Sequence, residues 1–155
     1  MANIFDVAEF ILNDLDTSST MKLQKIIFYS HAYHLVHYGS PLVNSRVEAW
    51  ANGPVFPELF SKHRHSFVVA HGHFAPYAPG EKLTTSEVVS IRRALQAFRS
   101  KTGSELSELT HSEVPWVKAR EGLSPSARSH NEITNAAIRS FYAVGTGANP
   151  LFAAR

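Results

Sequence analysis

Residues 21–38 decide how this chain folds, and they read MKLQKIIFYSHAYHLVHY. Apolar residues recur at intervals of three to four positions from Leu23 to Val36, which is the spacing of a helical face. Much of the remaining surface of this predicted helix is apolar as well. Polar residues 16–20 come before it, and Gly39 is a typical residue at which to end it. We therefore expect this helix to lie in the core.

Helices are also predicted on both sides of this segment. The first covers about residues 4–14, where Asn3 can cap free backbone amides and Asp6 lies favourably in the first turn. After the central helix, Pro57 suits the first turn of a short helix that runs to about residue 63. A longer helix is predicted from the capping-box pattern at Thr84–Glu87, and it ends before Gly103.

The last third of the chain predicts three short helices. Ser104 can cap the first of them, and the pattern Thr110-His-Ser-Glu113 predicts a second capping box, with Glu113 reaching back to the cap amide. That second helix carries Pro115 in its first turn and ends near residue 122. Trp116 is expected to be buried where these two helices meet. Asn131 is the predicted cap of the last helix, which presents an apolar face from residue 133 to residue 142.

The remaining segments predict little regular structure. Two short runs within residues 41–50, with a turn at Asn44-Ser45, indicate a small β-hairpin. Residues 66–82 carry glycines and prolines without a sustained period, which is typical of an irregular connection. The predicted fold is mainly α: a single compact helical domain of about six helices over residues 1–145, followed by a flexible tail over residues 146–155.

Composition limits the classes of function. The 155 residues are 44% hydrophobic and 18% charged, with no cysteine and a formal net charge of +2. This is enough apolar material for one core. The absence of cysteine, of a basic leader and of a long uninterrupted apolar segment leads us to expect a soluble, cytoplasmic protein outside the membrane. The charge is too evenly spread to predict a nucleic-acid surface.

Nine histidines raise the question of a metal site. His31 and His34 share a helical face, but His37 is rotated away from them, and no His-Glu-x-x-His motif occurs. His111-Ser-Glu113 resembles the start of a zinc-deaminase motif but lacks the thiolate ligands that this chemistry needs. We therefore predict no metal, no cofactor and no catalytic residue, while an enzyme that uses histidines and a metal stays open as an alternative.

Several short motifs follow one another in a characteristic order. They include Met21-Lys-Leu-Gln-Lys25, Glu48-Ala-Trp50, Gly53-Pro-Val55, Leu106–His111 and Pro115-Trp116. In this order the chain resembles the Panacea-domain antitoxin family, which includes SocA-like and phage-associated GepA-like proteins. The resemblance covers about residues 4–142. The residues that carry it are Leu23, Tyr29, His34, Trp50, Gly53, Pro54, Thr110, His111, Glu113, Pro115, Trp116 and Arg120.

This resemblance implies an antitoxin that binds and neutralises a cognate toxin without catalysis. In the family, toxins are of unrelated types and include alarmone-synthetase-like enzymes that block translation. A second reading is a proteolytic adaptor that delivers the toxin to a cellular protease. The oligomeric state, including a homo-oligomer, stays open.

Irregular backbone and aromatic residues point to one stretch as the toxin-binding surface. The predicted contact residues are Pro54, Phe56, Phe60, Phe74 and Tyr77. The short pair Phe56 and Phe60 has the spacing of a buried helical face, so a core role is an equal alternative. The second candidate surface is the basic side of the helix after residue 84, with Arg92, Arg93 and Arg99.

Overall fold

The computed structural model describes residues 1–145 and 147–153. The described chain is mainly α, as the sequence predicts. Its helices are α1 (Ile4–Leu15), α2 (Thr20–Tyr38), α3 (Pro57–Phe60), α4 (Thr85–Phe98), α5 (Gly103–His111), α6 (Val114–Ala119) and α7 (Asn135–Tyr142), with a 3-10 turn η1 at Ala75–Tyr77. No helix in the described ranges is both long enough and apolar enough to cross a membrane.

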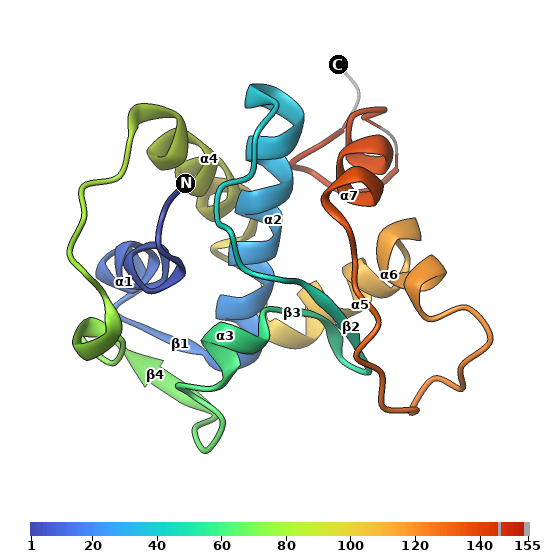
Figure 1. Ribbon diagram of the computed structural model, residues 1–155, viewed down its shortest axis with the longest axis horizontal. Helices are drawn as coiled ribbons and strands as arrows, with labels where there is room; N and C mark the ends of the chain where they lie inside the picture. Colours follow the sequence, from blue (N-terminus) through green and yellow to red (C-terminus); the bar gives the residue numbers. More distant parts are fainter. Residues whose placement is uncertain (146, 154–155) are drawn as a thin grey trace.

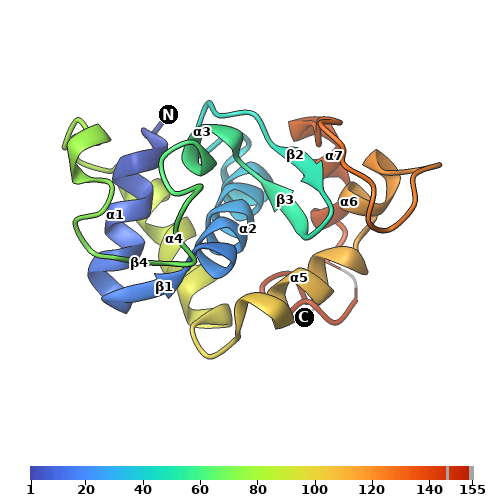
Figure 2. The same ribbon diagram turned by 90° about the horizontal axis from the view of Figure 1, so that it is seen from below.

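Helix α2 lies at the centre of the molecule. Figures 1 and 2 show α1 and α4 on one side of it and α5, α6 and α7 on the other. Every residue from Leu23 to Ala32 is buried, so all sides of the helix are covered. The apolar surface noted in the sequence is therefore covered on both sides, which confirms the predicted core position.

Two of the predicted helix N-caps are confirmed and two are wrong. Asn3 caps α1, and Thr84 forms the predicted capping box with Glu87. The next capping box uses Thr102 and Glu105, so α5 does not begin at the predicted Ser104. Helix α7 is capped by Thr134 and not by Asn131. Asn131 instead belongs to an extended segment, whose backbone carbonyl accepts a hydrogen bond from the amide of Ala49 at 2.9 Å.

The predicted hairpin is displaced along the chain. Strand β2 (Glu48–Trp50) pairs antiparallel with β3 (Gly53–Val55), and the connecting turn is Ala51-Asn52. The expected turn at Asn44-Ser45 is therefore wrong. Gly53 has a φ of +120°, which side chains other than hydrogen rarely allow, and it closes the tight reversal. Residues 41–47 instead run past the N-terminus, where the amide of Ala2 donates to the carbonyl of Leu42.

A second small sheet lies in segments that were predicted as loops. Strand β1 (Thr17–Ser19) pairs antiparallel with β4 (Val68–Ala70), and Ser18 stands opposite Val69. Strands of three residues are too short to show an alternating pattern, so hydrophobic periodicity could not predict them. The pairing ties the start of α2 to the long connection, which then turns through η1 back to α1.

The segment after α7 folds back onto the domain. Asn149 and Phe152 are buried, and the ring of Phe152 lies 4.6 Å from that of Tyr142 and 6.4 Å from that of Tyr33. Of the tail predicted at residues 146–155, positions 146, 154 and 155 lie outside the described residues. Within residues 147–153, Phe152 packs against α2 and α7, and the flexibility of the tail stays a prediction.

The packing of this segment gives a stability prediction. Phe152→Ala should lower the free energy of unfolding by about 3 kcal/mol, because it opens a cavity beside Tyr142. Val144→Ala is the control, since Val144 is 67% exposed, and it should change stability by less than about 0.5 kcal/mol. Urea unfolding measures both. Equal, small effects would mean that the segment contributes no packing energy.

Candidate functional site

Glu113 is the centre of a buried polar network. Its Oε1 accepts hydrogen bonds from the hydroxyls of Tyr29 at 2.5 Å and Tyr142 at 2.8 Å, and its Oε2 accepts one from the side-chain amide of Asn149 at 2.8 Å. Burial raises the pKa of Glu113, although these three donors oppose the shift. Burial also raises the pKa of both tyrosines, and the nearby carboxylate adds to it. One carboxyl group thus joins α2, α7 and the C-terminal segment.

This arrangement corrects the capping role predicted for Glu113. Its backbone is the N-cap of α6, but its side chain makes no capping hydrogen bond. The hydroxyl of Thr110 donates to the carbonyl of Ser107 within α5 instead of capping a new helix. The pattern Thr110–Glu113 matched a capping box because the spacing is the same. Its glutamate is used for a tertiary contact that spacing does not reveal.

Lys25 lies in the core one turn before Tyr29. Its side chain is almost completely buried, and its Nζ donates to the carbonyl of Pro54 at 3.3 Å. Burial lowers the pKa of Lys25 to about 7. A charged amine in such a place is unfavourable, so it is close to losing its proton at neutral pH.

Gly53 and Pro54 cover this lysine. A Cβ at position 53 would stand 2.4 Å from Cε of Lys25 and 2.9 Å from the hydroxyl of Thr110. The close approach and the positive φ together require glycine. The Gly-Pro motif is therefore a packing element over α2 and α5, and Pro54 is buried.

Gln24 fastens the next part of the chain to α2. Its Oε1 accepts the amide of Phe56 at 2.9 Å, and its Nε2 donates to the carbonyl of the same residue at 3.3 Å. The same Nε2 lies 3.0 Å from Nε2 of His63, whose pKa is lowered by burial. Gln24 therefore bonds to both backbone groups of Phe56, the residue before α3, and holds it against the core.

Two histidines of α2, His31 and His34, bond to other parts of the protein. His34 bonds through Nδ1 to the carbonyl of Ser40 at 2.6 Å and through Nε2 to the hydroxyl of Ser86 at 3.0 Å. His31 bonds to Asn135 at 2.9 Å, and burial lowers its pKa to about 4. Over residues 1–145 and 147–153, no three histidine, aspartate or glutamate residues lie close enough together to hold a metal ion.

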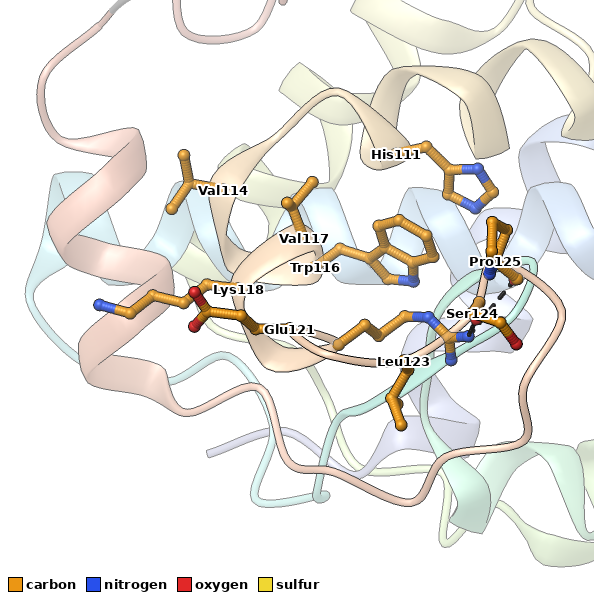
Figure 3. A pocket seen from close by; sticks show the side chains of 10 residues that line it. His111, Val114, Trp116, Val117, Lys118, Glu121, Leu123, Ser124 and Pro125 are labelled. Carbon is orange, nitrogen blue, oxygen red and sulfur yellow. Dashed lines mark hydrogen bonds between the residues drawn. The ribbon is translucent and has the colours of Figure 1, made fainter.

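Trp116, His111 and Arg120 form a stack beside a surface pocket. The rings of His111 and Trp116 are 4.0 Å apart and nearly parallel, and the guanidinium of Arg120 lies 5.2 Å from the Trp116 ring. Trp116 is half-buried and not buried as predicted, because one side of it faces the pocket, which holds about 580 Å³. Figure 3 shows Val114 and Val117 on the same helix as Trp116, with Leu123 on the loop that follows.

Backbone groups hold this stack in place. The indole N–H of Trp116 donates to the carbonyl of Trp50 at 2.7 Å, which links α6 to β2. Nε2 of His111 is buried and has no hydrogen-bond partner among the described residues. The pKa of His111 is lowered by burial and by the nearby charge of Lys25. An imidazole without its extra proton suits this position.

Arg120 organises the loop after α6. Its guanidinium donates to the carbonyls of Ala49, Ser124, Pro125 and Ala127 at 2.7–3.3 Å. Arginine alone offers five donors in a planar fork, so one side chain can bond several carbonyls. The arginine that belongs to the sequence motif is thus used to shape a loop over the β2–β3 hairpin.

The predicted toxin-contact residues do not share one exposed surface. Pro54, Phe56 and Phe74 are buried, and Phe56 and Phe74 belong to the hydrophobic core. Phe60 is half-buried, with its ring 4.8 Å from that of Trp50. Tyr77 is 44% exposed and packs against Phe5 at 5.7 Å. Although Phe74 belongs to the irregular connection at residues 66–82, it lies against α1, where its backbone amide donates to Oε2 of Glu9 at 3.0 Å.

The second predicted surface is exposed. Arg92, Arg93 and Arg99 lie on or just after α4, and all three are solvent-exposed. Two of them already have neighbours: Arg92 lies 5.8 Å from the ring of Phe10, and Arg99 forms an ion pair with Asp14. On this face, Arg92 and Arg99 therefore already interact with side chains of α1.

The motif residues share one property that sequence reasoning did not reveal. Each of the residues that carry the family resemblance is buried or half-buried. Sequence reasoning also missed the roles of Gln24, Lys25 and Asn149. Polar residues within an otherwise apolar helix were the available signal for Gln24 and Lys25. No pattern in the sequence around Asn149 indicates that its side chain bonds to Glu113. The buried polar side chains described above mostly form hydrogen bonds with one another or with backbone groups. Such bonds stabilise the packing of the helices and strands.

Comparisons with known proteins identify the family of the chain. A family model described as "Antitoxin SocA-like, Panacea domain" matches residues 23–117, which is more than half of the chain. Antitoxin SocA from Caulobacter vibrioides (strain NA1000 / CB15N) is 45% identical over 42 residues. That match covers 27% of this chain and 22% of the relative. No solved structure matches the chain.

Buried Lys25 predicts a pH-dependent stability. An unfolded lysine has a pKa of about 10.4, so between pH 7 and that value the unfolded state binds more protons, and wild-type stability rises with pH. Below this window both states hold the proton, and the full penalty of burying the charge is present. Lys25→Met removes the penalty. It should stabilise the protein at about pH 6 and less so at about pH 10.

Urea unfolding at the two pH values measures the effect of Lys25→Met. The exposed Lys101 provides the control, since Lys101→Met should change stability by less than about 0.5 kcal/mol at either pH. A stabilisation of equal size at both pH values would contradict a lowered pKa of Lys25.

Removal of the Glu113 carboxylate should be more harmful than removal of a helix cap. Glu113→Ala leaves two buried hydroxyls and one amide without an acceptor, and each costs about 1–3 kcal/mol, so we expect a loss of more than about 3 kcal/mol. Glu105→Ala removes a true capping-box partner and should cost about 1 kcal/mol. Urea unfolding compares them. Equal losses would restore the capping interpretation.

Proposed function

Because the chain belongs to the SocA-like Panacea-domain antitoxin family, we propose that it is an antitoxin that neutralises a cognate toxin by binding it directly. The observation that carries the proposal is the family match over residues 23–117, which begins within α2 and ends within α6. A cytoplasmic location is part of the same proposal, since a toxin is neutralised where it is made.

The way the polar residues are used supports binding over catalysis. Glu113 and Lys25 are buried, as are His31 and His34 of α2, and all four bond to residues of other elements. A catalytic group must reach its substrate within hydrogen-bond distance. Protein recognition, in contrast, needs a rigid scaffold that presents exposed side chains.

The motif residues therefore specify the scaffold, and recognition falls to other positions. Exposed large apolar side chains include Phe67 and Val68 near β4, Val114 and Val117 on α6, and Leu123 in the loop that follows. Such residues lie outside the buried motif set, so they can vary between members while the fold is kept.

Co-expression tests the proposal. The toxin is taken as the product of the gene next to this one, and growth is measured with and without this protein. We expect growth to recover and the two purified proteins to co-elute in gel filtration. An empty vector serves as the control and should fail to restore growth.

Two other outcomes would overturn direct neutralisation. Failure of the wild-type protein to restore growth or to co-elute removes the antitoxin proposal for this pair. Restored growth together with a fall in toxin abundance that depends on a cellular protease supports the adaptor reading instead. Immunoblots of the toxin during the growth experiment distinguish these cases.

A further inference from the structure

Strand β4 has an unpaired edge. The sheet contains β1 and β4, so within the described residues β4 has a strand neighbour on one side. Figure 1 places β4 outside β1, at the lower edge of the molecule. An open edge of this kind is a template on which another extended segment can pair.

The hydrogen-bond pattern shows which backbone groups face outward. The amide of Thr20 donates to the carbonyl of Phe67 at 2.9 Å, and that of His71 donates to the carbonyl of Asp16 at 2.8 Å. In an antiparallel ladder the bonded residues alternate, so positions 67, 69 and 71 face β1 while Val68 and Ala70 face away. The carbonyl of Ala70 accepts the amide of His73. The outward groups that remain are the N–H and C=O of Val68 and the N–H of Ala70.

Exposed apolar side chains accompany this edge. Phe67 is 90% exposed and Val68 is 62% exposed, whereas Val69 between β1 and the core is buried. Phe67 is thus an aromatic residue almost entirely in water at the start of a strand. Aromatic residues are enriched among the few residues that carry most of the binding energy in protein interfaces.

The sequence on either side of β4 contains basic residues and no acidic ones. No aspartate or glutamate occurs between Glu58 and Glu81, and this stretch contains Lys62 and Arg64, both exposed, immediately before β4. His71, just after the strand, lies 3.6 Å from Glu9, whose two carboxylate oxygens also accept the amides of Gly72 and Phe74. Nζ of Lys62 lies 4.8 Å from the centre of the Tyr77 ring and keeps its charge there, so with Arg64 it makes the approach to β4 from residue 62 cationic. Such a surface complements an acidic partner.

We propose that the free edge of β4 binds an extended, acidic segment of the toxin, which adds a third strand to the β1–β4 sheet. The inference rests on the proposed antitoxin function and names the surface that performs it. The N–H and C=O of Val68 bond to the added strand. Phe67 supplies apolar contact, and Lys62 and Arg64 attract the acidic side chains of that segment.

Loss of one backbone donor tests the added strand. Val68→Pro removes the outward N–H and leaves the bonds to β1 in place, and proline is tolerated at such edge positions. Val68→Thr keeps the N–H and is the matched control. The Kd for the purified toxin, measured by calorimetry, should rise about tenfold or more for Val68→Pro and for Phe67→Ala, and stay near the wild-type value for Val68→Thr. Melting temperatures check that each variant is folded.

Charge reversal tests the chemistry of the partner. Lys62→Glu combined with Arg64→Glu should weaken toxin binding about tenfold or more and reduce its sensitivity to salt. Lys101→Glu, at an exposed lysine after α4, is the control and should have little effect. Unchanged affinity in the double variant would overturn the acidic character of the segment.

The outcomes separate this inference from the proposed function. If the wild-type protein binds the toxin and restores growth while folded Val68→Pro and Phe67→Ala do the same, the antitoxin role holds and the β4 edge is not the interface. If the wild-type protein itself fails, the proposed function fails. Wild-type binding to a single-stranded oligonucleotide, or self-association, that is lost in Val68→Pro would assign the edge to nucleic acid or to a second copy, and either result overturns the proposal.

Discussion

The burial of α2 on all sides is the constraint on which the rest of the structure depends. A helix with polar residues within its buried length cannot leave those groups without partners, because an unpaired polar group in the core costs about 1–3 kcal/mol. Gln24, Lys25 and Tyr29 therefore each take a partner from a distant part of the chain. The neighbours of α2 are positioned as much by these bonds as by apolar packing.

Three connections follow from this constraint. Gln24 holds the backbone of Phe56, so the start of α3 is attached directly to the central helix. Lys25 needs the carbonyl of Pro54, and a glycine before that proline lets the hairpin come close enough. Tyr29 shares Glu113 with Tyr142, which draws α7 and the start of α6 to the same side. A change at one of these bonds is felt by elements far apart in the sequence.

The same arrangement separates the motif residues from many of the exposed apolar residues. The motif residues are turned inward, and the exposed apolar residues sit on short or irregular elements such as β4 and the loop after α6. Elements of this kind can change without disturbing the core, because few of their side chains contribute to it.

The sequence by itself determined the mainly α class, the central position of residues 20–38 and the caps at Asn3 and Thr84, because helical period and capping are local properties. It did not determine the pairing of β1 with β4, the turn at Ala51-Asn52 or the burial of Phe74, since strands of three residues show no period. Nor did it show that Glu113 serves two tyrosines and Asn149, which lie 84, 29 and 36 positions away. The spacing around Glu113 fitted a cap equally well. Only the tertiary structure could decide between these roles, because a buried carboxylate bonds to whichever donors the fold brings within reach.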